Sequence, residues 1–276
     1  MNKKLILISL IIIIVNGINA QTPNQYQPFS YDFYQKLNSK VYDKNTSFHS
    51  AIKPYFADHA ILKATIDSFN NYGLDTLNRS WVHRKLLTEH LIEINKPEYT
   101  FYADYLPDLV LGNDSESGNN IWLNTRGYQA GLTVGNKFSF YTSGYENQGV
   151  FPTYITNFID ANKVIPGQVG GKLGNLEKDW AYSTASLSYT ANKYLNFTLA
   201  YDKNFIGDGY RSMLLSDVSA NYSFFKVKAS LGAVQYQTVF AYMLDPGAPR
   251  LTTDRRLGDR GKWGAFHYLD WNVNHR

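Results

Sequence analysis

The sequence predicts a mainly β protein: a transmembrane antiparallel β-barrel, incomplete in this chain, that follows a small N-terminal helical segment. Three observations predict this fold. A secretory leader opens the chain. From Tyr99 onward, apolar and polar residues alternate with the period of two that is typical of strands. Short turns also alternate with long connections, as in outer-membrane barrels, whose short turns lie in the periplasm and whose long loops lie outside.

Residues 1–20 have the features of a cleaved signal peptide. Lys3 and Lys4 precede an apolar run from Leu5 to Val15, and Ala20 stands at the expected cleavage point. A membrane-spanning helix needs about 20 apolar residues, and this run has roughly half that number. We therefore expect export from the cytoplasm and a mature chain that begins at Gln21.

Composition excludes several classes of protein. There is no cysteine, so no disulfide can stabilise the fold. The formal charge is +4, and removal of the two leader lysines leaves +2 on the mature chain, too little to suggest binding to nucleic acid. The mean hydropathy of −0.35 is compatible with a transmembrane barrel, because polar and apolar residues alternate along each of its strands.

Residues 21–97 form the expected N-terminal periplasmic segment of loops and helices. A helix is predicted from Ser80 to Ile94, because its apolar residues recur at helical spacing and Ser80 suits the N-cap. A weaker helical pattern covers Ala57 to Phe69 and begins shortly after Pro54.

Residues 98–276 form the expected strands of the partial barrel, about eight to ten of them by the alternation pattern. The clearest hairpin joins Ala181–Thr190 to Tyr194–Asp202, and a second joins Tyr128–Val134 to Lys137–Tyr145 through Gly135 and Asn136. The last expected strand is Ala265–Val273.

The strand pattern alone is equally compatible with a barrel and with a soluble β-sandwich. The lengths of the connections favour the barrel. Short turns at 135–136, 191–193 and about 231–233 alternate with long segments at 146–180, 203–221 and 245–262. Aromatic residues also cluster at expected strand ends, as interfacial girdles require: Tyr128, Tyr141, Tyr145, Tyr201, Tyr222, Tyr242, Trp263 and Trp271.

Six stretches spread over most of the mature chain carry a resemblance: "SFHSAIKPY" (Ser47 to Tyr55), "RKLLTEHLIEI" (Arg84 to Ile94), "NTRGYQAGLTVGNKFSFYTSGYENQ" (Asn124 to Gln148), "VIPGQ" (Val164 to Gln168), "NFIGDGYRSMLLSD" (Asn204 to Asp217) and "GAFHYLDWNV" (Gly264 to Val273). Together they resemble the capsule assembly protein Wzi-like family of Bacteroidetes outer-membrane proteins, which includes the gliding motility protein RemB. The resemblance implies an outer-membrane barrel with a periplasmic helical part that acts as a lectin-like anchor or assembly factor for surface polysaccharide. Members of that family are considerably longer, so we expect this chain to be the N-terminal part of a longer barrel.

The loop from Gly207 to Asp217 contains the first candidates for carbohydrate binding. Asp208, Arg211 and Asp217 can hydrogen-bond sugar hydroxyls or acidic sugars, and Tyr210 can stack on a sugar ring. The alternative is that Arg211 pairs with one of the two aspartates, or with an acid inside the barrel, and only holds the loop. The sequence leaves open whether this loop lies outside the barrel or folds into its lumen.

Arg126 and Glu146 are the other two candidates for carbohydrate binding. Because a buried charge without a partner is costly, both are expected to face the lumen or a rim, where they either contact ligand or stiffen the barrel.

No motif predicts a metal, a cofactor or catalysis. His83 and His90 are two helical turns apart, about 10 Å along a helix axis, which is too far to share one ion. Residues 167–174 resemble a phosphate-binding loop, but Leu173 follows the lysine where Ser or Thr is required. Neither a nucleophile elbow nor a cysteine nucleophile is present, so we expect a non-enzymatic protein.

The expected function is to bind or organise capsular or surface polysaccharide from the cell outer membrane. The expected partners are that polysaccharide, outer-membrane lipid and gliding or surface-assembly proteins. Two alternatives remain at this point: a structural component of the gliding machinery without glycan binding, and a secreted β-sandwich enzyme.

Overall fold

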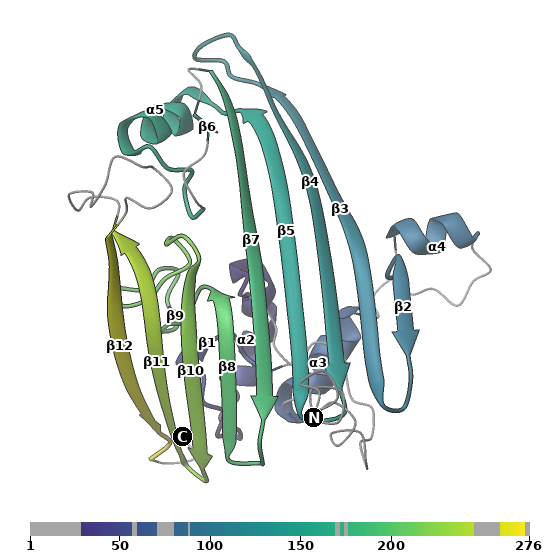
Figure 1. Cartoon of the computed structure of the whole chain (residues 1–276), viewed down its shortest axis with the longest axis vertical. Helices are drawn as coiled ribbons and strands as arrows, with labels where there is room; N and C mark the ends of the chain where they lie inside the picture. The colour runs from purple at the N-terminus through teal and green to yellow at the C-terminus, as the bar shows by residue number, and fades with distance from the viewer. Residues whose placement is uncertain are drawn as a thin grey trace, which may run out of the picture.

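The computed structural model describes residues 29–56, 60–70, 80–87, 89–168, 172–173, 176–245 and 260–273. The expected signal peptide and cleavage point lie outside these ranges. The described chain is mainly β, with one large antiparallel sheet and a few short helices (Figure 1). Within the described residues, no helix is both long enough and apolar enough to cross a membrane.

Nine strands follow one another across the large sheet in the order β12-β11-β10-β8-β7-β5-β4-β3-β2, and β6 pairs with β7 beside this path. Every pairing is antiparallel. The strands are β2 (Ile92–Asn95), β3 (Tyr99–Asn113), β4 (Asn120–Val134), β5 (Phe138–Val150), β6 (Lys172–Leu173), β7 (Glu177–Thr190), β8 (Leu195–Asp202), β10 (Tyr222–Leu231), β11 (Val234–Asp245) and β12 (Arg260–Trp271). Because β2 and β12 are edges, the sheet is not closed into a barrel within the described chain.

The expected short turns are confirmed, and they lie together at one rim of the sheet (Figure 1). Gly135 and Gly232 occupy two of these turns with φ of 55° and 60°, a left-handed conformation that glycine adopts without steric cost. The connection from β5 to β7 contains the helix α5 (Thr153–Asn162), and the connection from β8 to β10 contains the short strand β9 (Phe205–Ile206). Residues 246–259, between β11 and β12, lie outside the described ranges.

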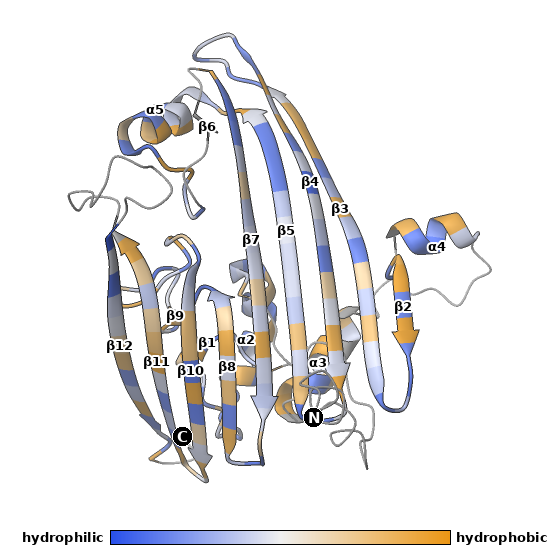
Figure 2. Cartoon of the chain, in the orientation of Figure 1, coloured by the Kyte–Doolittle hydropathy of each residue, from blue (hydrophilic) through white to orange (hydrophobic). Residues whose placement is uncertain are grey.

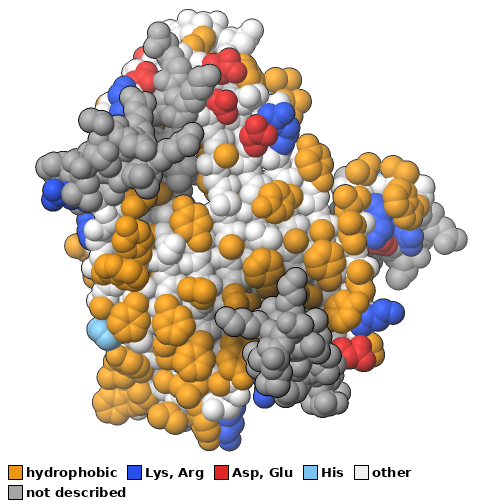
Figure 3. All heavy atoms as spheres, in the orientation of Figure 1, with side chains coloured by type: hydrophobic (Ala, Val, Ile, Leu, Met, Phe, Trp, Pro, Cys, Tyr) orange, Lys and Arg blue, Asp and Glu red, His pale blue; other side chains and the backbone are white. Residues whose placement is uncertain are grey.

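The two faces of the sheet have the reverse of the polarity usual in soluble proteins. Along β7 and β8 the polar side chains are the buried ones, with Ser188 and Thr198 both 0% exposed. Leu187 and Leu199 alternate with them and are 43% and 59% exposed. Figure 2 shows hydrophobic and hydrophilic residues alternating along the strands, and Figure 3 shows hydrophobic side chains gathered over the sheet on the viewer's face.

Strand register aligns the exposed apolar residues into rows that cross the whole sheet. The central row, as we name it, contains Phe101, Leu132, Phe140, Leu187, Leu199, Phe225, Phe240 and Ala265, from β3 to β12. We use the term apolar band for the positions on this outward face between the short turns and the pair Arg126–Glu146. Among the described residues, the apolar band carries no Lys, Arg, Asp or Glu side chain.

The N-terminal segment packs on the opposite, concave face of the sheet. The helices α2 (Tyr31–Val41) and α3 (Ala60–Asn70) lie behind the strands in Figure 1. They form a small core in which the α2 residues Tyr34 and Leu37 meet Leu62 and Ile66 of α3. The strand β1 (Ile52–Lys53) pairs with β9, which joins this segment to the connection between β8 and β10.

The inward side chains of β10–β12 contact this N-terminal segment directly. Lys228 places its Nζ 4.0 Å from the centre of the Phe56 ring. Met243 and Phe266 pack against the cluster that contains Ile52. The concave face is therefore filled by the protein's own chain at this end of the sheet.

The helix predicted from Ser80 to Ile94 is too long, because α4 spans only Trp81–Leu87. Ser80 does cap it, since its Oγ accepts a hydrogen bond from the backbone N–H of His83 at 3.3 Å. Ile94 belongs instead to the edge strand β2, where pairing with β3 satisfies the backbone groups that a helix would have used. The other predicted helix is α3, which begins at Ala60; residues 57–59 lie outside the described ranges.

Several strands are longer than the alternation predicted. β4 starts at Asn120 instead of Tyr128, and β5 continues to Val150, because their ladder extends past the glycines of the predicted hairpin. The last strand is also displaced, running from Arg260 to Trp271. Three of the eight expected girdle residues point inward, because they share the phase of buried polar neighbours: Tyr141, Tyr145 and Tyr222.

Candidate functional site

The loop from Gly207 to Asp217 folds against the N-terminal segment on the concave face. Ile206 of β9 pairs with Ile52, and the backbone N–H of Gly207 donates to the carbonyl oxygen of Ala51 at 2.7 Å. Gly207 has a φ of 117°, a value that L-amino acids with side chains rarely adopt. The glycine therefore lets the chain turn away from β9 at this point.

Lys53 holds the first part of this loop. Its Nζ donates to the carbonyl oxygen of Gly207 at 2.6 Å, to Oδ1 of Asp208 at 3.0 Å and to the carbonyl oxygen of Ser50 at 3.3 Å. Burial lowers the pKa of Lys53, and the neighbouring Asp208 carboxylate opposes that shift. Asp208 thus has a structural partner on β1.

The remaining loop candidates make local contacts. The Tyr210 ring is 65% exposed, meets the edge of the Tyr31 ring at 4.9 Å and lies 5.4 Å from the guanidinium carbon of Arg211. Asp217 accepts a hydrogen bond from the Ser216 hydroxyl at 2.9 Å through Oδ1. Among the described residues, Asp208 forms its ion pair with Lys53, and the alternative pairing of Arg211 with Asp208 or Asp217 is not found.

Arg126 and Glu146 are directly opposite each other on β4 and β5, with Nη2 of Arg126 3.4 Å from Oε1 of Glu146. Both side chains point to the outward face and are about half exposed. Of the two places expected for them, the lumen or a rim, the concave face is excluded, because their register phase is that of the apolar band. They lie at the limit of that band, on the opposite face from the 207–217 loop, so the six sequence candidates do not form one site.

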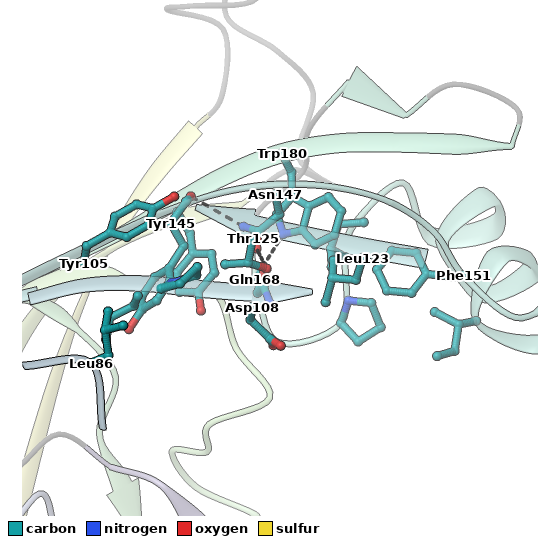
Figure 4. Close-up of a pocket in the computed structure, with 16 residues that line it drawn as sticks. Leu86, Tyr105, Asp108, Leu123, Thr125, Tyr145, Asn147, Phe151, Gln168 and Trp180 are labelled. Carbon is teal, nitrogen blue, oxygen red and sulfur yellow. Dashed lines mark hydrogen bonds between the residues drawn. The ribbon is translucent and has the colours of Figure 1, made fainter. Parts of the chain in front are cut away.

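A cavity of about 660 Å³ opens on the concave face near the rim of the long connections. Two neighbouring inward rows form its floor. The first row contains Leu106, Tyr145 and Tyr182 beside Gly127, and the second contains Asp108, Thr125, Asn147 and Trp180. Ile155 of α5 and residues Ile165, Pro166 and Gln168 line another part of it, and Leu86 of α4 lies at the end near Tyr105 (Figure 4).

The absence of a side chain at Gly127 makes room for the aromatic rings of this floor. The rings of Tyr145 and Tyr182 are stacked, with centroids 4.9 Å apart and planes 23° from parallel. A Cβ atom on Gly127 would lie 2.5 Å from Cδ1 of Tyr145, closer than such atoms can approach. Glycine at position 127 therefore leaves the space that the Tyr145 ring occupies.

Polar groups converge beside these rings, as Figure 4 shows. The Thr125 hydroxyl donates to Oδ1 of Asn147 at 2.8 Å, and Nε1 of Trp180 donates to Oε1 of Gln168. Trp180 is only 4% exposed, so its ring is fixed by burial as well as by this bond. The carboxylate of Asp108, in contrast, belongs to an exposed residue at the mouth of the cavity.

Sequence reasoning missed this cavity. Tyr145 and Trp180 were interpreted as a girdle residue and as the end of a loop. The phase of the alternation was an available signal, because Tyr145 has the same parity in the sequence as the polar residues Ser143 and Asn147, which the structure places inside the sheet. Tyr145, an aromatic residue within this series of polar residues, is therefore expected on the inward face, where it lines the cavity.

Comparison with protein-family models, with curated proteins and with solved structures gives no match for this chain. Among the described residues, no group of three or more His, Cys, Asp or Glu side chains is arranged to hold a metal ion.

Proposed function

We propose that this protein is an outer-membrane β-barrel component that binds or organises surface or capsular polysaccharide. The observation that carries the proposal is the reversed polarity of the sheet. Soluble proteins rarely leave a contiguous apolar surface of this kind uncovered, whereas the strands of a membrane barrel alternate apolar residues towards lipid with polar residues towards the lumen.

The dimensions of the apolar band support a bilayer location. On β4 the band runs from Val134 at the short turn to Arg126, an interval of eight residue positions. At roughly 3.4 Å per residue and a tilt of about 40°, this interval spans about 21 Å along the membrane normal. It is close to the apolar band of about 25 Å that outer-membrane barrels present to lipid.

The glycan part of the proposal is supported by the concave wall and by the resemblance to the Wzi-like family. A cavity of about 660 Å³ lined by aromatic rings and amide groups has the size and chemistry of a small-molecule site. The loop from Gly207 to Asp217 lies on the same face of the sheet and adds a second polar surface.

A structural role in gliding or surface-protein assembly is the second candidate. It is favoured by exposed apolar side chains near the rim of the long connections, where Leu109 and Leu111 of β3 and Tyr154 of α5 are each at least two-thirds exposed. Such residues offer a surface to a partner protein instead of to a glycan.

Cell fractionation followed by a polysaccharide pull-down tests the proposal. We expect the chain in the outer-membrane fraction, and we expect the protein, purified in detergent, to retain surface polysaccharide prepared from the same cells. A freely soluble periplasmic product contradicts the membrane assignment. Recovery in the membrane without retention of polysaccharide favours the structural role.

A further inference from the structure

We propose that the cavity floored by Tyr145, Tyr182 and Asn147 binds an uncharged pyranose unit of the polysaccharide. This inference deepens the proposed function and rests on it. It places sugar recognition at residues other than the six that the sequence suggested for carbohydrate binding.

The shape of the floor fits a sugar ring. Tyr145 and Tyr182 are inward neighbours on β5 and β7, and their stack presents an aromatic surface next to the polar row of Asn147 and Trp180. The face of an aromatic ring carries partial negative charge, and the C–H groups on one side of a pyranose carry partial positive charge. A sugar can therefore lie on the rings while its hydroxyls reach the polar row.

The hydrogen-bonding groups of the wall suit hydroxyls. Oε1 of Gln168 accepts a hydrogen bond from Nε1 of Trp180, so the two N–H donors of its Nε2 group are available to a ligand. Nδ2 of Asn147 is 3.5 Å from the carbonyl oxygen of Tyr145, at the limit of a hydrogen bond, and can donate to a closer ligand oxygen. Asp108 supplies carboxylate oxygens that accept from two neighbouring hydroxyls. The wall thus offers both donors and acceptors.

The charge of the wall decides the class of sugar. Asp108 is the one charged residue in the lining, and the described lining contains no Lys, Arg or His. A uronic acid would bring a second carboxylate towards Asp108 without a cation to offset the repulsion. The cavity therefore selects neutral units, in contrast to the 207–217 loop, where Arg211 and Lys53 supply positive charge.

The test measures binding of defined oligosaccharides to the chain in lipid vesicles by calorimetry. The probes are cellotetraose, mannotetraose and galactotetraose as neutral ligands, tetragalacturonic acid as the acidic ligand, and polysaccharide prepared from the same cells. We expect a neutral probe to bind and tetragalacturonic acid not to bind. The Tyr182→Ala variant should weaken neutral binding at least about tenfold, because the stacking surface is lost.

Three further variants separate the outcomes. Tyr182→Phe keeps the ring and should bind within about threefold of the original chain, which guards against a folding defect in Tyr182→Ala. Tyr210→Ala removes an exposed ring from the 207–217 loop, outside the cavity, and should leave the binding of neutral probes unchanged. Asp108→Asn removes the carboxylate and should allow tetragalacturonic acid to bind.

The inference fails if tetragalacturonic acid binds and no neutral probe does. It also fails if Tyr182→Ala retains the cells' own polysaccharide as well as the original chain does, even though the proposed function then stands. Failure of the original chain to retain any polysaccharide overturns the proposed function itself and the inference with it.

Discussion

Replacement of Leu199 by arginine tests the reversed polarity most directly. Leu199 lies on β8 in the central row and is 59% exposed. For a strand in water, a substitution at so exposed a position changes the free energy of unfolding by about 0.5 kcal/mol or less. For a lipid-facing strand, an arginine at the bilayer midplane costs about 2–4 kcal/mol.

Leu231 provides a matched control on the neighbouring strand. It has the same side chain, is 66% exposed and also faces outward, but it lies at the short turn. Leu231 lies six residue positions along β10 from Phe225, the partner of Leu199 in the register, and this interval corresponds to about 15 Å along the membrane normal. An arginine there reaches the interface, so we expect a cost of only about 0–1 kcal/mol.

The assay is reversible urea unfolding of each variant in lipid vesicles, followed by tryptophan fluorescence. The expected result is a difference of about 2 kcal/mol or more between Leu199→Arg and Leu231→Arg. If both variants unfold within about 0.5 kcal/mol of the original chain, the outward face lies in water and the membrane assignment is wrong.

Three other predictions concern the concave face and the rim of the long connections. Gly127→Ala should destabilise the protein by about 1–3 kcal/mol and weaken the binding of neutral sugars. Gly144→Ala is the control, because its added Cβ would also lie 2.5 Å from a tyrosine ring, that of the outward Tyr128, and it should lower stability without changing binding. Equal sugar binding by the two variants would contradict this. Lys53→Met leaves the carbonyl oxygen of Gly207 without its donor and Asp208 without its ion-pair partner, at about 1–3 kcal/mol, whereas the carbonyl oxygen of Ser50 keeps its hydrogen bond from the Tyr55 hydroxyl. Limited proteolysis should therefore cut the 207–217 loop faster than in the original chain, and unchanged cleavage would show that Lys53 does not hold it. Hydrogen bonds from Thr153 and Ser117 hold the pKa of Asp114 well below its usual range. The stabilising effect of Asp114 on α5 is therefore present above about pH 4 and is lost as the pH falls towards the pKa of Asp114 in the folded state. The difference in hydrogen exchange between the original chain and Asp114→Ala should shrink over that pH interval, and a constant difference would refute this account.

Much of the sheet was predictable because strand alternation and turn chemistry are local. The hairpin of β7 and β8 and the turn at Gly135 were found where expected, since a period of two and a glycine in a tight turn need no information from distant residues. The end of the helix at Leu87 was not predictable in this way. Its continuation to Ile94 was prevented by pairing with β3, a tertiary contact that outweighs a helical pattern.

The candidate site was only partly predictable. Asp208 was predicted to contact a sugar or to pair with Arg211, but its partner is Lys53, which is 155 positions away, and no local pattern connects the two. Arg126 and Glu146 are paired across two strands as their types suggest, yet the face on which they lie depends on register.

The sequence by itself determined which side chains share a face, because the backbone of a strand turns successive residues to opposite sides. Only the tertiary structure decided which of the two faces is uncovered, since the alternation is the same whether the apolar side meets lipid or a second protein layer. The pairing of residues 52–53 with 205–206, and the meeting of Tyr145, Tyr182 and Trp180 in one cavity, also required the folded sheet. Such contacts join residues far apart in the chain, and their geometry follows from register and curvature, which no short stretch of sequence contains.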